Sequence, residues 1–324
     1  MLYITTRGNR DAYTSHRALC NDVAPDGGRY IPFKMPRYSE AEIISFQKKS
    51  FGQVVAEILN AFFSAGITGM DVDFCIGKNS VKMTPMSHRI CVAEMWHNLA
   101  GNYESIVNGL NKKVHGEDVP SVWFKTAVRI SMLFALYGEM LRHDLIEPQK
   151  TFDISVDANN FAEPIAAIYA REMGLPIGTI ICTSVENGIL WDVIHRGSFA
   201  SAADSDLALG LEQLLFATLG QYAVKDYISA YRSKSTYSVN DVQLAELNRG
   251  LFCSVVGNSR VEATINSVYR SNQCLLDASA ALCYGGLQDY RAKTGSTSIT
   301  LLFSNRTPSD FVDKTLDAAG SCEK

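Results

Sequence analysis

The segment from Thr151 to Ile177 contains the residues whose types and spacing best suit ligand chemistry. Its polar loop, Asp157 to Glu163, follows an extended stretch and precedes a predicted helix. In open α/β proteins such a loop binds anionic groups, because free N–H groups and the helix dipole converge at the N-terminus of the helix. The segment therefore predicts a binding place for an anionic group.

A strand and a helix must position this loop. Residues Phe152 to Val156 alternate between apolar and polar, which is typical of a half-buried strand. Pro164 suits the first turn of a helix, where its missing N–H costs nothing, and Gly174 to Pro176 ends the run. The helix is predicted to bury one apolar face, formed by Ile165, Ile168, Tyr169 and Met173.

Length and composition limit the classes of protein that the chain can represent. It has 324 residues, of which 47% are hydrophobic and 20% are charged, with a net charge of −4. These values predict about two globular domains. The negative charge argues against a general affinity for nucleic acid or anionic membranes, so the expected partners are small molecules or proteins. The N-terminal residues lack the apolar core of a signal peptide, and no stretch reaches 18 apolar residues, so we expect a cytoplasmic protein.

The cysteines and histidines do not predict a metal site. Eight cysteines are scattered among mostly apolar neighbours without a C-x-x-C pair, which favours reduced thiols in the core. The six histidines likewise lack the spacing of metal ligands. We therefore expect no metal cofactor.

The N-terminal residues carry a recognisable pattern. Tyr3 to Gly8 reads YITTRG, and Ala24 to Pro32 reads APDGGRYIP. Together they closely resemble the amino-terminal signature of the threonine synthase family. The resemblance implies fold type II of the pyridoxal phosphate enzymes, an open α/β sheet with helices like that of the tryptophan synthase β chain. It also implies an N-terminal domain over residues 1–88 and a cofactor-type α/β domain over 89–324.

The family's cofactor lysine is replaced. Threonine synthases carry a motif of the form E-L-F-H-G-P-T-x-x-F-K-D, whose lysine forms a Schiff base with pyridoxal phosphate. Without a gap, Glu94 and His97 match this motif, Tyr103 falls on its aromatic position and Glu104 falls on its lysine. A carboxylate cannot form a Schiff base. The segment is therefore interpreted as a plain strand and helix.

A second alignment places the lysine at Lys125. It pairs His115 with Phe124-Lys125 and needs three extra residues between histidine and lysine. The same residues also fit a later family element, an S-I-N-W turn before a long apolar helix. If that assignment holds, the chain passes near Asn111 to Pro120 directly to this late element. The small cofactor-side domain, with its S-G-D-T-G carboxylate loop, is then largely deleted.

Two further family motifs are altered. The phosphate loop G-N-F-G-D corresponds here to Asn159, Asn160, Phe161, Ala162 and Glu163, a vestigial loop in which both glycines are lost. Asparagine tolerates a positive φ, whereas the Cβ of alanine blocks close approach of a phosphate, so weaker phosphate binding is expected.

The motif L-x-D-P-H-T-A, which lies near the cofactor ring, has Ser279 at its histidine and Ala280 at its threonine. Elsewhere, Glu186 or Asn187 is expected to cap a helix, and His195 is expected to be structural. Residues 65–88 are predicted to form loop and short strand, and a final helix is predicted from Asn305 to Ala319.

These losses predict a catalytically inactive threonine synthase-like protein that binds no pyridoxal phosphate. Two alternatives remain open. One is a pyridoxal phosphate-dependent lyase that uses Lys125 on a phosphorylated hydroxy-amino acid, and the other is a non-covalent binder of a phosphorylated metabolite. A second copy or a protein partner is expected to cover the surface that the deleted domain would leave.

Overall fold

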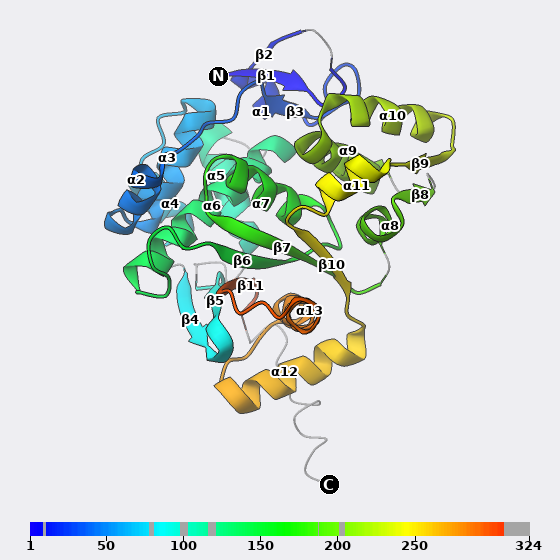
Figure 1. Cartoon of the computed structure of the whole chain (residues 1–324). Coiled ribbons are helices and arrows are strands. Elements are labelled where there is room, and N and C mark those ends of the chain that lie inside the picture. The colour runs from blue at the N-terminus through cyan, green and yellow to red at the C-terminus, as the bar shows by residue number, and fades with distance from the viewer. Residues whose placement is uncertain are drawn as a thin grey trace.

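The computed structural model describes residues 1–8, 11–77, 81–97, 103–115, 121–186, 188–200 and 205–307. Its centre is a six-stranded sheet built from β4 (Lys82–Met86), β5 (Ile90–Glu94), β6 (Phe152–Asp157), β7 (Ile177–Ser184), β10 (Leu251–Val255) and β11 (Thr300–Ser304). The strand order is β10-β7-β6-β11-β5-β4 (Figure 1). All neighbouring strands are parallel except β4, which runs antiparallel to β5 at the edge. The other two sheets in the described ranges are small, with three strands and two strands.

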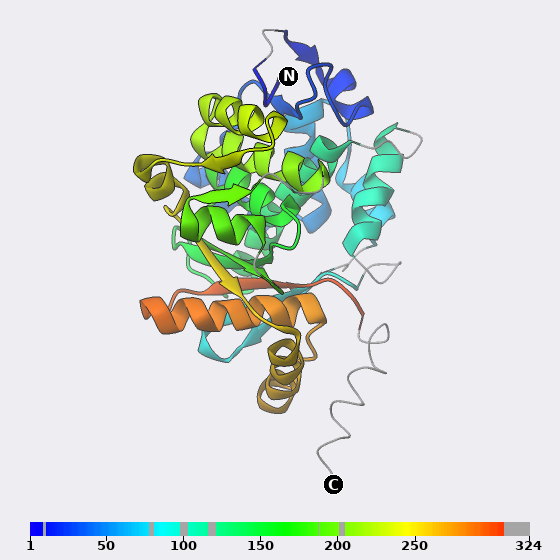
Figure 2. The same cartoon turned by 90° about the vertical axis from the view of Figure 1, so that its right-hand side faces the viewer.

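Helices cover both faces of this sheet. One side carries α2 (Glu40–Ser45), α3 (Phe51–Phe63), α4 (Gly69–Ile76), α5 (Tyr103–His115), α6 (Val122–Arg142) and α7 (Ala162–Glu172). The other side carries α12 (Asn258–Asn272) and α13 (Ala278–Thr294), which Figure 2 shows below the sheet. Each side has its own cluster of buried apolar residues, so the sheet separates two cores. This is the layered arrangement expected of a parallel sheet.

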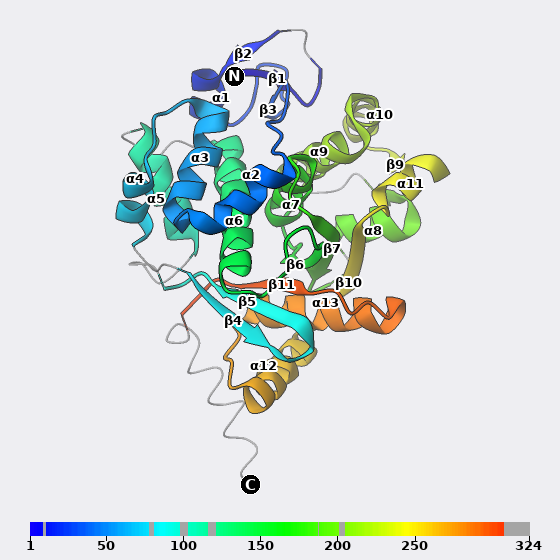
Figure 3. The same cartoon turned by 60° about the vertical axis from the view of Figure 1, so that its left-hand side comes forward.

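The N-terminal residues form a small antiparallel sheet of β1 (Leu2–Thr5), β2 (Tyr13–Thr14) and β3 (Tyr30–Pro32), with α1 (Ser15–Cys20) beside it. The predicted turn before β3 is present, and Gly27 adopts φ 81° there, a conformation that favours glycine. From β3 the chain runs down to α2 alongside α7, where the Tyr38 N–H donates to the Met173 carbonyl at 2.9 Å (Figure 3).

A third group of elements lies at the β10 edge of the sheet (Figure 1). It consists of α8 (Ile189–Arg196), β8 (Ser198–Ala200), α9 (Ser205–Leu219), α10 (Gln221–Arg232), β9 (Thr236–Ser238) and α11 (Asp241–Leu247). The sequence predicted α8, and the spacing of Leu211, Leu214, Leu215 and Leu219 predicts a helix from Leu207 to Gln221, which corresponds to α9. It gave no prediction for α10, β9 or α11.

The predicted strand from Phe152 to Val156 is present as β6, but it is not half-buried. It lies between β7 and β11, and its polar residues are buried together with its apolar ones. Asp153 accepts the Thr179 N–H at 2.8 Å, and the Ser155 hydroxyl donates to the Cys283 carbonyl at 2.8 Å. Because neighbouring elements satisfy these polar groups, the alternation of residue types did not indicate exposure.

The prediction of loop and short strand over residues 65–88 is wrong in part, because α4 occupies Gly69–Ile76. Thr68 and Asp71 form a reciprocal capping box at its start. A Thr-x-x-Asp pattern was therefore the available sequence signal. The predicted final helix falls mostly outside the described residues, and Asn305 to Thr307 are not helical.

Most of the described cysteines are buried, as the sequence predicted. Seven cysteines are described, none of them is bonded to another, and five are buried. Within the described residues no helix has the length and apolar character needed to cross a bilayer. One apolar cluster extends from Tyr3 in β1 to Leu301 in β11, and the division at residue 88 stays a prediction.

Candidate functional site

A cavity of about 670 Å³ lies at the carboxyl edge of the six-stranded sheet. Asp157 ends β6 there, Val185 follows β7 and Asn305 follows β11. The first residues of α12 and α13, Asn258 and Ala278, also line it. This edge is where open α/β proteins bind their ligands. We call it the carboxyl-edge cavity; its charged lining consists of Glu104, Asp157, Glu163, Asp277, Arg129 and Arg306.

Arg129 connects the two sequence motifs that face this cavity. Its Nη2 lies 2.5 Å from Oε1 of Glu104, and its Nε lies 3.1 Å from Oε1 of Glu163. The arginine side chain is 10% exposed, against 58% for Glu104 and 22% for Glu163. Glu104, which the resemblance places at the family's lysine position, is thus joined through one guanidinium to Glu163 of the predicted phosphate loop.

The hydrogen bonds of the 159–163 loop are made within the protein. Asp157 Oδ1 accepts the Asn159 N–H at 2.9 Å, and Asn160 Oδ1 accepts the Ala162 N–H at 3.0 Å. Asn159 Oδ1 in turn accepts the Val185 N–H at 3.2 Å. Two backbone donors that a phosphate loop would offer to its ligand are therefore already used.

The loop backbone also differs from the expectation for a phosphate loop. None of the residues 157–163 has a positive φ, so Asn159 and Ala162 replace the family's glycines without backbone strain. Phe161 is buried and packs against Gly210 of α9, where an added Cβ would lie 2.6 Å from the phenyl ring. Phe161 is thus a packing element in this chain.

Negative charge dominates the cavity. Burial raises the pKa of Glu163, Arg129 lowers it, and the charges of Glu104 and Asp157 raise it further. Burial likewise raises the pKa of Asp277, against the effect of its hydrogen bonds. Four carboxylates face two arginines, one of which already bridges two of the carboxylates. Where these carboxyl groups are ionised, they would repel a phosphate.

Asp277 and Ser279 have structural partners. Asp277 caps α13 by accepting the Ala280 N–H at 2.7 Å, and its second oxygen accepts the Arg306 N–H at 2.9 Å. The Ser279 hydroxyl donates to Asp157 Oδ2 at 3.1 Å. Ala280 is fully buried beneath the cap. This corner is therefore fixed by hydrogen bonds between the ends of β6, β11 and α13.

The structure places Lys125 one helical turn before Arg129 on α6. Lys125 is partly buried and is not among the residues that line the carboxyl-edge cavity. Glu94 and His97, which match the family motif, lie at the end of β5, where His97 Nε2 is 2.8 Å from Glu94 Oε2. Asn98 and Leu99 lie outside the described residues.

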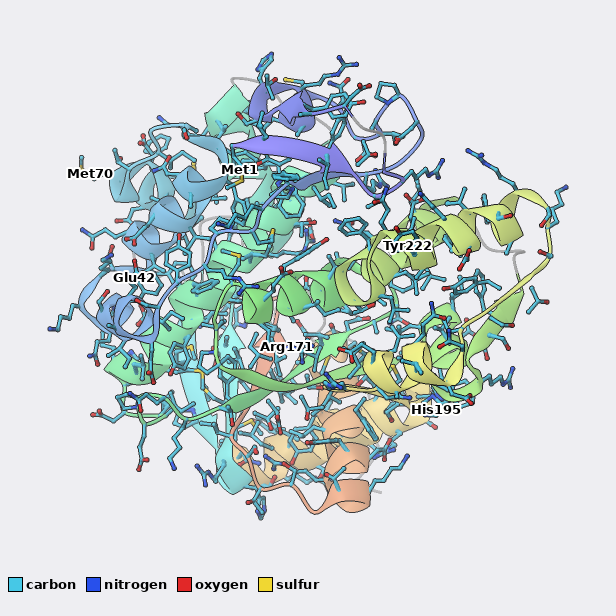
Figure 4. All side chains as sticks on the ribbon, turned by 45° about the horizontal axis from the view of Figure 1, so that its top comes forward. Met1, Glu42, Met70, Arg171, His195 and Tyr222 are labelled. Carbon is cyan, nitrogen blue, oxygen red and sulfur yellow. The ribbon has the colours of Figure 1, made fainter. Side chains whose placement is uncertain are left out.

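One capping prediction is wrong. The N-cap of α8 is Gly188, without a side-chain hydrogen bond, so Glu186 does not cap this helix. Asn187 lies outside the described residues. His195 is exposed at the periphery of α8 (Figure 4), where its ring stacks on Trp191 at 4.4 Å and its Nδ1 lies 3.1 Å from the Trp191 carbonyl. This placement suits a structural residue.

Sequence reasoning did not single out Arg129, although it joins the two altered motifs. The available signal was a lone arginine in the apolar run AVRISMLFAL, since a charge there is seldom buried without a partner. Its partners could not be inferred, because Glu104 and Glu163 lie in two other helices.

The described residues do not fit pyridoxal phosphate at this cavity. Its lining includes no lysine, the position that matches the family lysine carries an ion-paired carboxylate, and loop donors are occupied. Among the described histidines, cysteines and carboxylates, no group of three or more is arranged to hold a metal ion.

Solved structures define the class of this fold. A Brucella melitensis threonine synthase with bound pyridoxal phosphate matches with a TM-score of 0.81 and 17% identity, over 98% of this chain and 91% of that chain. The yeast threonine synthase matches with a TM-score of 0.82 and 14% identity, over 100% and 90% of the two chains. The fold is therefore that of the type II pyridoxal phosphate enzymes.

Sequence comparison shows similarity to threonine synthases and threonine synthase-like proteins. The family model "Threonine synthase N terminus" matches residues 2–79. Threonine synthase from Pseudomonas aeruginosa is 28% identical over 166 residues, which make up 48% of this chain and 35% of that protein. Threonine synthase-like 1 from Macaca fascicularis is 22% identical over 258 residues, or 76% of this chain and 32% of that protein. This chain is thus similar in sequence to threonine synthases, and the matched segments span about a third of the length of these two proteins.

Proposed function

We propose that this threonine synthase-like protein is catalytically inactive and that its retained fold serves a binding or structural role. The observation that carries the proposal is the Arg129 bridge between Glu104 and Glu163. A cofactor lysine must be free to react with an aldehyde, whereas this position holds a carboxylate tied to a guanidinium.

The bridge also disfavours a simple change of substrate. Arg129 could otherwise pair with a phosphate, but it already forms ion pairs with two carboxylates of this chain. A phosphate would have to displace them and would then leave Glu163 without its main positive neighbour. The same reasoning disfavours the non-covalent binding of a phosphorylated metabolite at the 159–163 loop.

The first experiment tests the cofactor. The purified protein is incubated with pyridoxal phosphate, reduced with borohydride and analysed by intact mass and peptide mapping. The expected result is no site-specific adduct, with the same background in wild type and in Lys125→Ala. A stoichiometric adduct on Lys125 would instead restore the lyase hypothesis.

The second experiment tests substrate and phosphate. Release of inorganic phosphate from phosphohomoserine is measured beside a known threonine synthase, and thermal unfolding is recorded with phosphohomoserine or inorganic phosphate at millimolar concentration. We expect neither turnover nor a shift in Tm. A shift that Glu163→Gln enlarged would support the phosphate-binding alternative, because that substitution removes a repelling charge.

A further inference from the structure

A second cavity, of about 740 Å³, lies between the N-terminal segment and α10, and we call it the α10 cavity. Arg7 and Asp26 line one side of it, and Lys225, Ile228 and Arg232 line the other. None of its lining residues lines the carboxyl-edge cavity, so it is a separate feature of the fold. Arg7 and Asp26 belong to the YITTRG and APDGGRYIP patterns, to which the proposed function assigns no task.

The guanidinium of Arg7 has a fixed position at this cavity. Its Nε and Nη2 donate to Oε2 of Glu212 at 3.1 and 2.9 Å, and its Nη1 donates to the Asp26 carbonyl at 3.1 Å. The Glu212 side chain is 1% exposed, whereas that of Arg7 is 20% exposed and reaches the cavity. A Cβ on Gly27 would lie 2.4 Å from Nη1, so the glycine turn makes room for the guanidinium. Arg7 is therefore oriented by the fold before any ligand binds.

Arg7 keeps donors for a ligand. A guanidinium has five N–H groups, and those on Nε, Nη1 and Nη2 that serve Glu212 and the Asp26 carbonyl leave one N–H on each terminal nitrogen. These two have no partner among the described residues. Because Glu212 offsets the charge of Arg7, and the Asp26 carboxylate lies beside it, a neutral carbonyl oxygen suits these donors better than an anion.

Arg7 faces the middle of α10. Arg7 and Ile228 also line a smaller cavity, of about 210 Å³, so the two cavities meet at these residues. Ile228 lies between Lys225 and Arg232 along the helix. The donors of Arg7 are therefore flanked by a cation on each side.

The smaller cavity suits an apolar side chain. Apart from Gly27 and the Arg7–Glu212 pair, its lining is apolar or aromatic and consists of Ala208, Leu209, Tyr227, Ile228 and Tyr231. Burying an apolar group there would be favourable.

The two ends of the α10 cavity are positive. Lys225 and Arg232 are two helical turns apart, which corresponds to about 10 Å along α10. Neither forms an ion pair with another residue in the part of the chain that the structure describes. Three residues of an extended peptide also span about 10 Å, so carboxylates at its positions i and i+3 would match the two cations. A single small anion would meet only one of them.

We propose that the α10 cavity binds an extended acidic segment of a partner protein, with two carboxylates three residues apart and an apolar residue between them. The carboxylates pair with Lys225 and Arg232, a carbonyl between them accepts from Arg7, and the apolar side chain enters the smaller cavity. This gives the retained fold a binding role and does not rest on the inactivity of the carboxyl-edge cavity, since the two cavities share no residue.

The probe is a fluorescein-labelled peptide with the core Glu-Leu-Ala-Glu, capped at both ends and titrated with the full chain by fluorescence anisotropy. At low ionic strength we expect a dissociation constant below about 0.2 mM. The Gln-Leu-Ala-Gln peptide should bind at least about tenfold more weakly because it lacks both charges, and Glu-Ala-Ala-Glu about tenfold more weakly because it leaves the smaller cavity empty.

Arg232→Gln tests the protein side, and Lys234→Gln is its matched control. Both residues are exposed cations near the end of α10, but Lys234 does not line the α10 cavity. Arg232→Gln should weaken binding of the acidic peptide about tenfold, and Lys234→Gln should leave it as in wild type.

The proposal is overturned if wild type does not bind the acidic peptide, if the glutamine peptide binds equally well, or if the two protein variants have the same affinity. Equal binding of a short thymidine oligonucleotide would also overturn it, because the surface would then attract any polyanion. These outcomes are independent of the cofactor and phosphate experiments, which concern the carboxyl-edge cavity.

Discussion

Two residues distinguish the carboxyl-edge cavity from the site that the resemblance to threonine synthases implies. Glu104 stands where the resemblance places a cofactor lysine, and Arg129 neutralises it while also holding Glu163. A charge reversal at one position would by itself leave an unpaired carboxylate. The bridge converts it into an ion-pair network that joins α5, α6 and α7.

The bridge makes a prediction about stability. Arg129→Met should lower the free energy of unfolding by about 2 kcal/mol at pH 7.5, less than for a fully buried pair because Glu104 is exposed. The loss should shrink at pH 5. Burial raises the native pKa of Glu163, and removing Arg129 raises it further, so the carboxylate protonates as the pH falls and its unpaired charge disappears. Urea unfolding at both pH values measures this difference.

Arg142→Met is the control for this variant. Arg142 lies on the same helix and pairs with Glu139, but its side chain is 35% exposed. Arg142→Met should lower the free energy of unfolding by less than about 1 kcal/mol at either pH. A pH-independent loss in Arg129→Met would mean that the arginine stabilises the fold by packing and not by balancing Glu163.

The buried thiols give a second prediction at this scale. Burial raises the pKa of Cys91 to about 12 and that of Cys274 to about 11, so neither forms thiolate at pH 8. In the native protein both should resist iodoacetamide, whereas the partly exposed Cys20 should react first among the seven described cysteines. Peptide mapping after a timed reaction measures the order. Rapid labelling of Cys91 would show that its strand opens readily.

At the scale of elements, α13 depends on close contact with β7. Gly286 faces Thr183, and a Cβ at this position would lie 1.9 Å from Thr183 Oγ1. Gly285 similarly approaches Val256 beyond the end of β10. These two glycines let the helix lie directly on the sheet, which in turn sets the position of the Asp277 cap at the cavity.

Gly286→Ala should therefore destabilise the protein by about 1–3 kcal/mol, because the added methyl group must push α13 from β7. Gly109→Ala in α5 is the control, and its expected change in the free energy of unfolding has the opposite sign. A Cβ there meets its nearest neighbour, Cys75 Cβ, at 3.7 Å, so the higher helix propensity of alanine should stabilise by up to about 1 kcal/mol. Chemical unfolding compares the two. If Gly286→Ala and Gly109→Ala changed the free energy of unfolding equally, the close contact between α13 and β7 would be contradicted.

Across the whole molecule, the sequence predicted what depends on neighbours in the chain. The YITTRG and PDGG patterns fix turns and strands locally, and strong periodicity located β6, α6 and α7. The Arg129 bridge and the burial of Asp153 were not predictable in this way. Both depend on which elements meet in space, and the residues concerned are ordinary surface types when taken alone.

The ion pair between Arg7 and Glu212 links the N-terminal segment to α9, so breaking it shows how strongly this contact stabilises the fold. Glu212 of α9 is 1% exposed, Arg7 Nη2 lies 2.9 Å from its Oε2, and Thr6 Oγ1 also donates to it. Arg7→Met leaves this carboxylate buried without its cation and should cost about 3–5 kcal/mol. Because one apolar cluster includes β1 and the central sheet, urea unfolding should remain a single transition with a lower midpoint.

The double variant Arg7→Met/Glu212→Met distinguishes the effect of an unpaired buried charge from a general disruption of the fold. With both charges removed no buried carboxylate is left unpaired, so the double variant should be more stable than Arg7→Met alone. Arg249→Met, which breaks the exposed pair with Glu246 at 3.2 Å, should cost less than about 1 kcal/mol. A double variant as unstable as Arg7→Met would mean that Arg7 acts by packing. A separate early transition would mean that residues 1–88 unfold as a domain of their own.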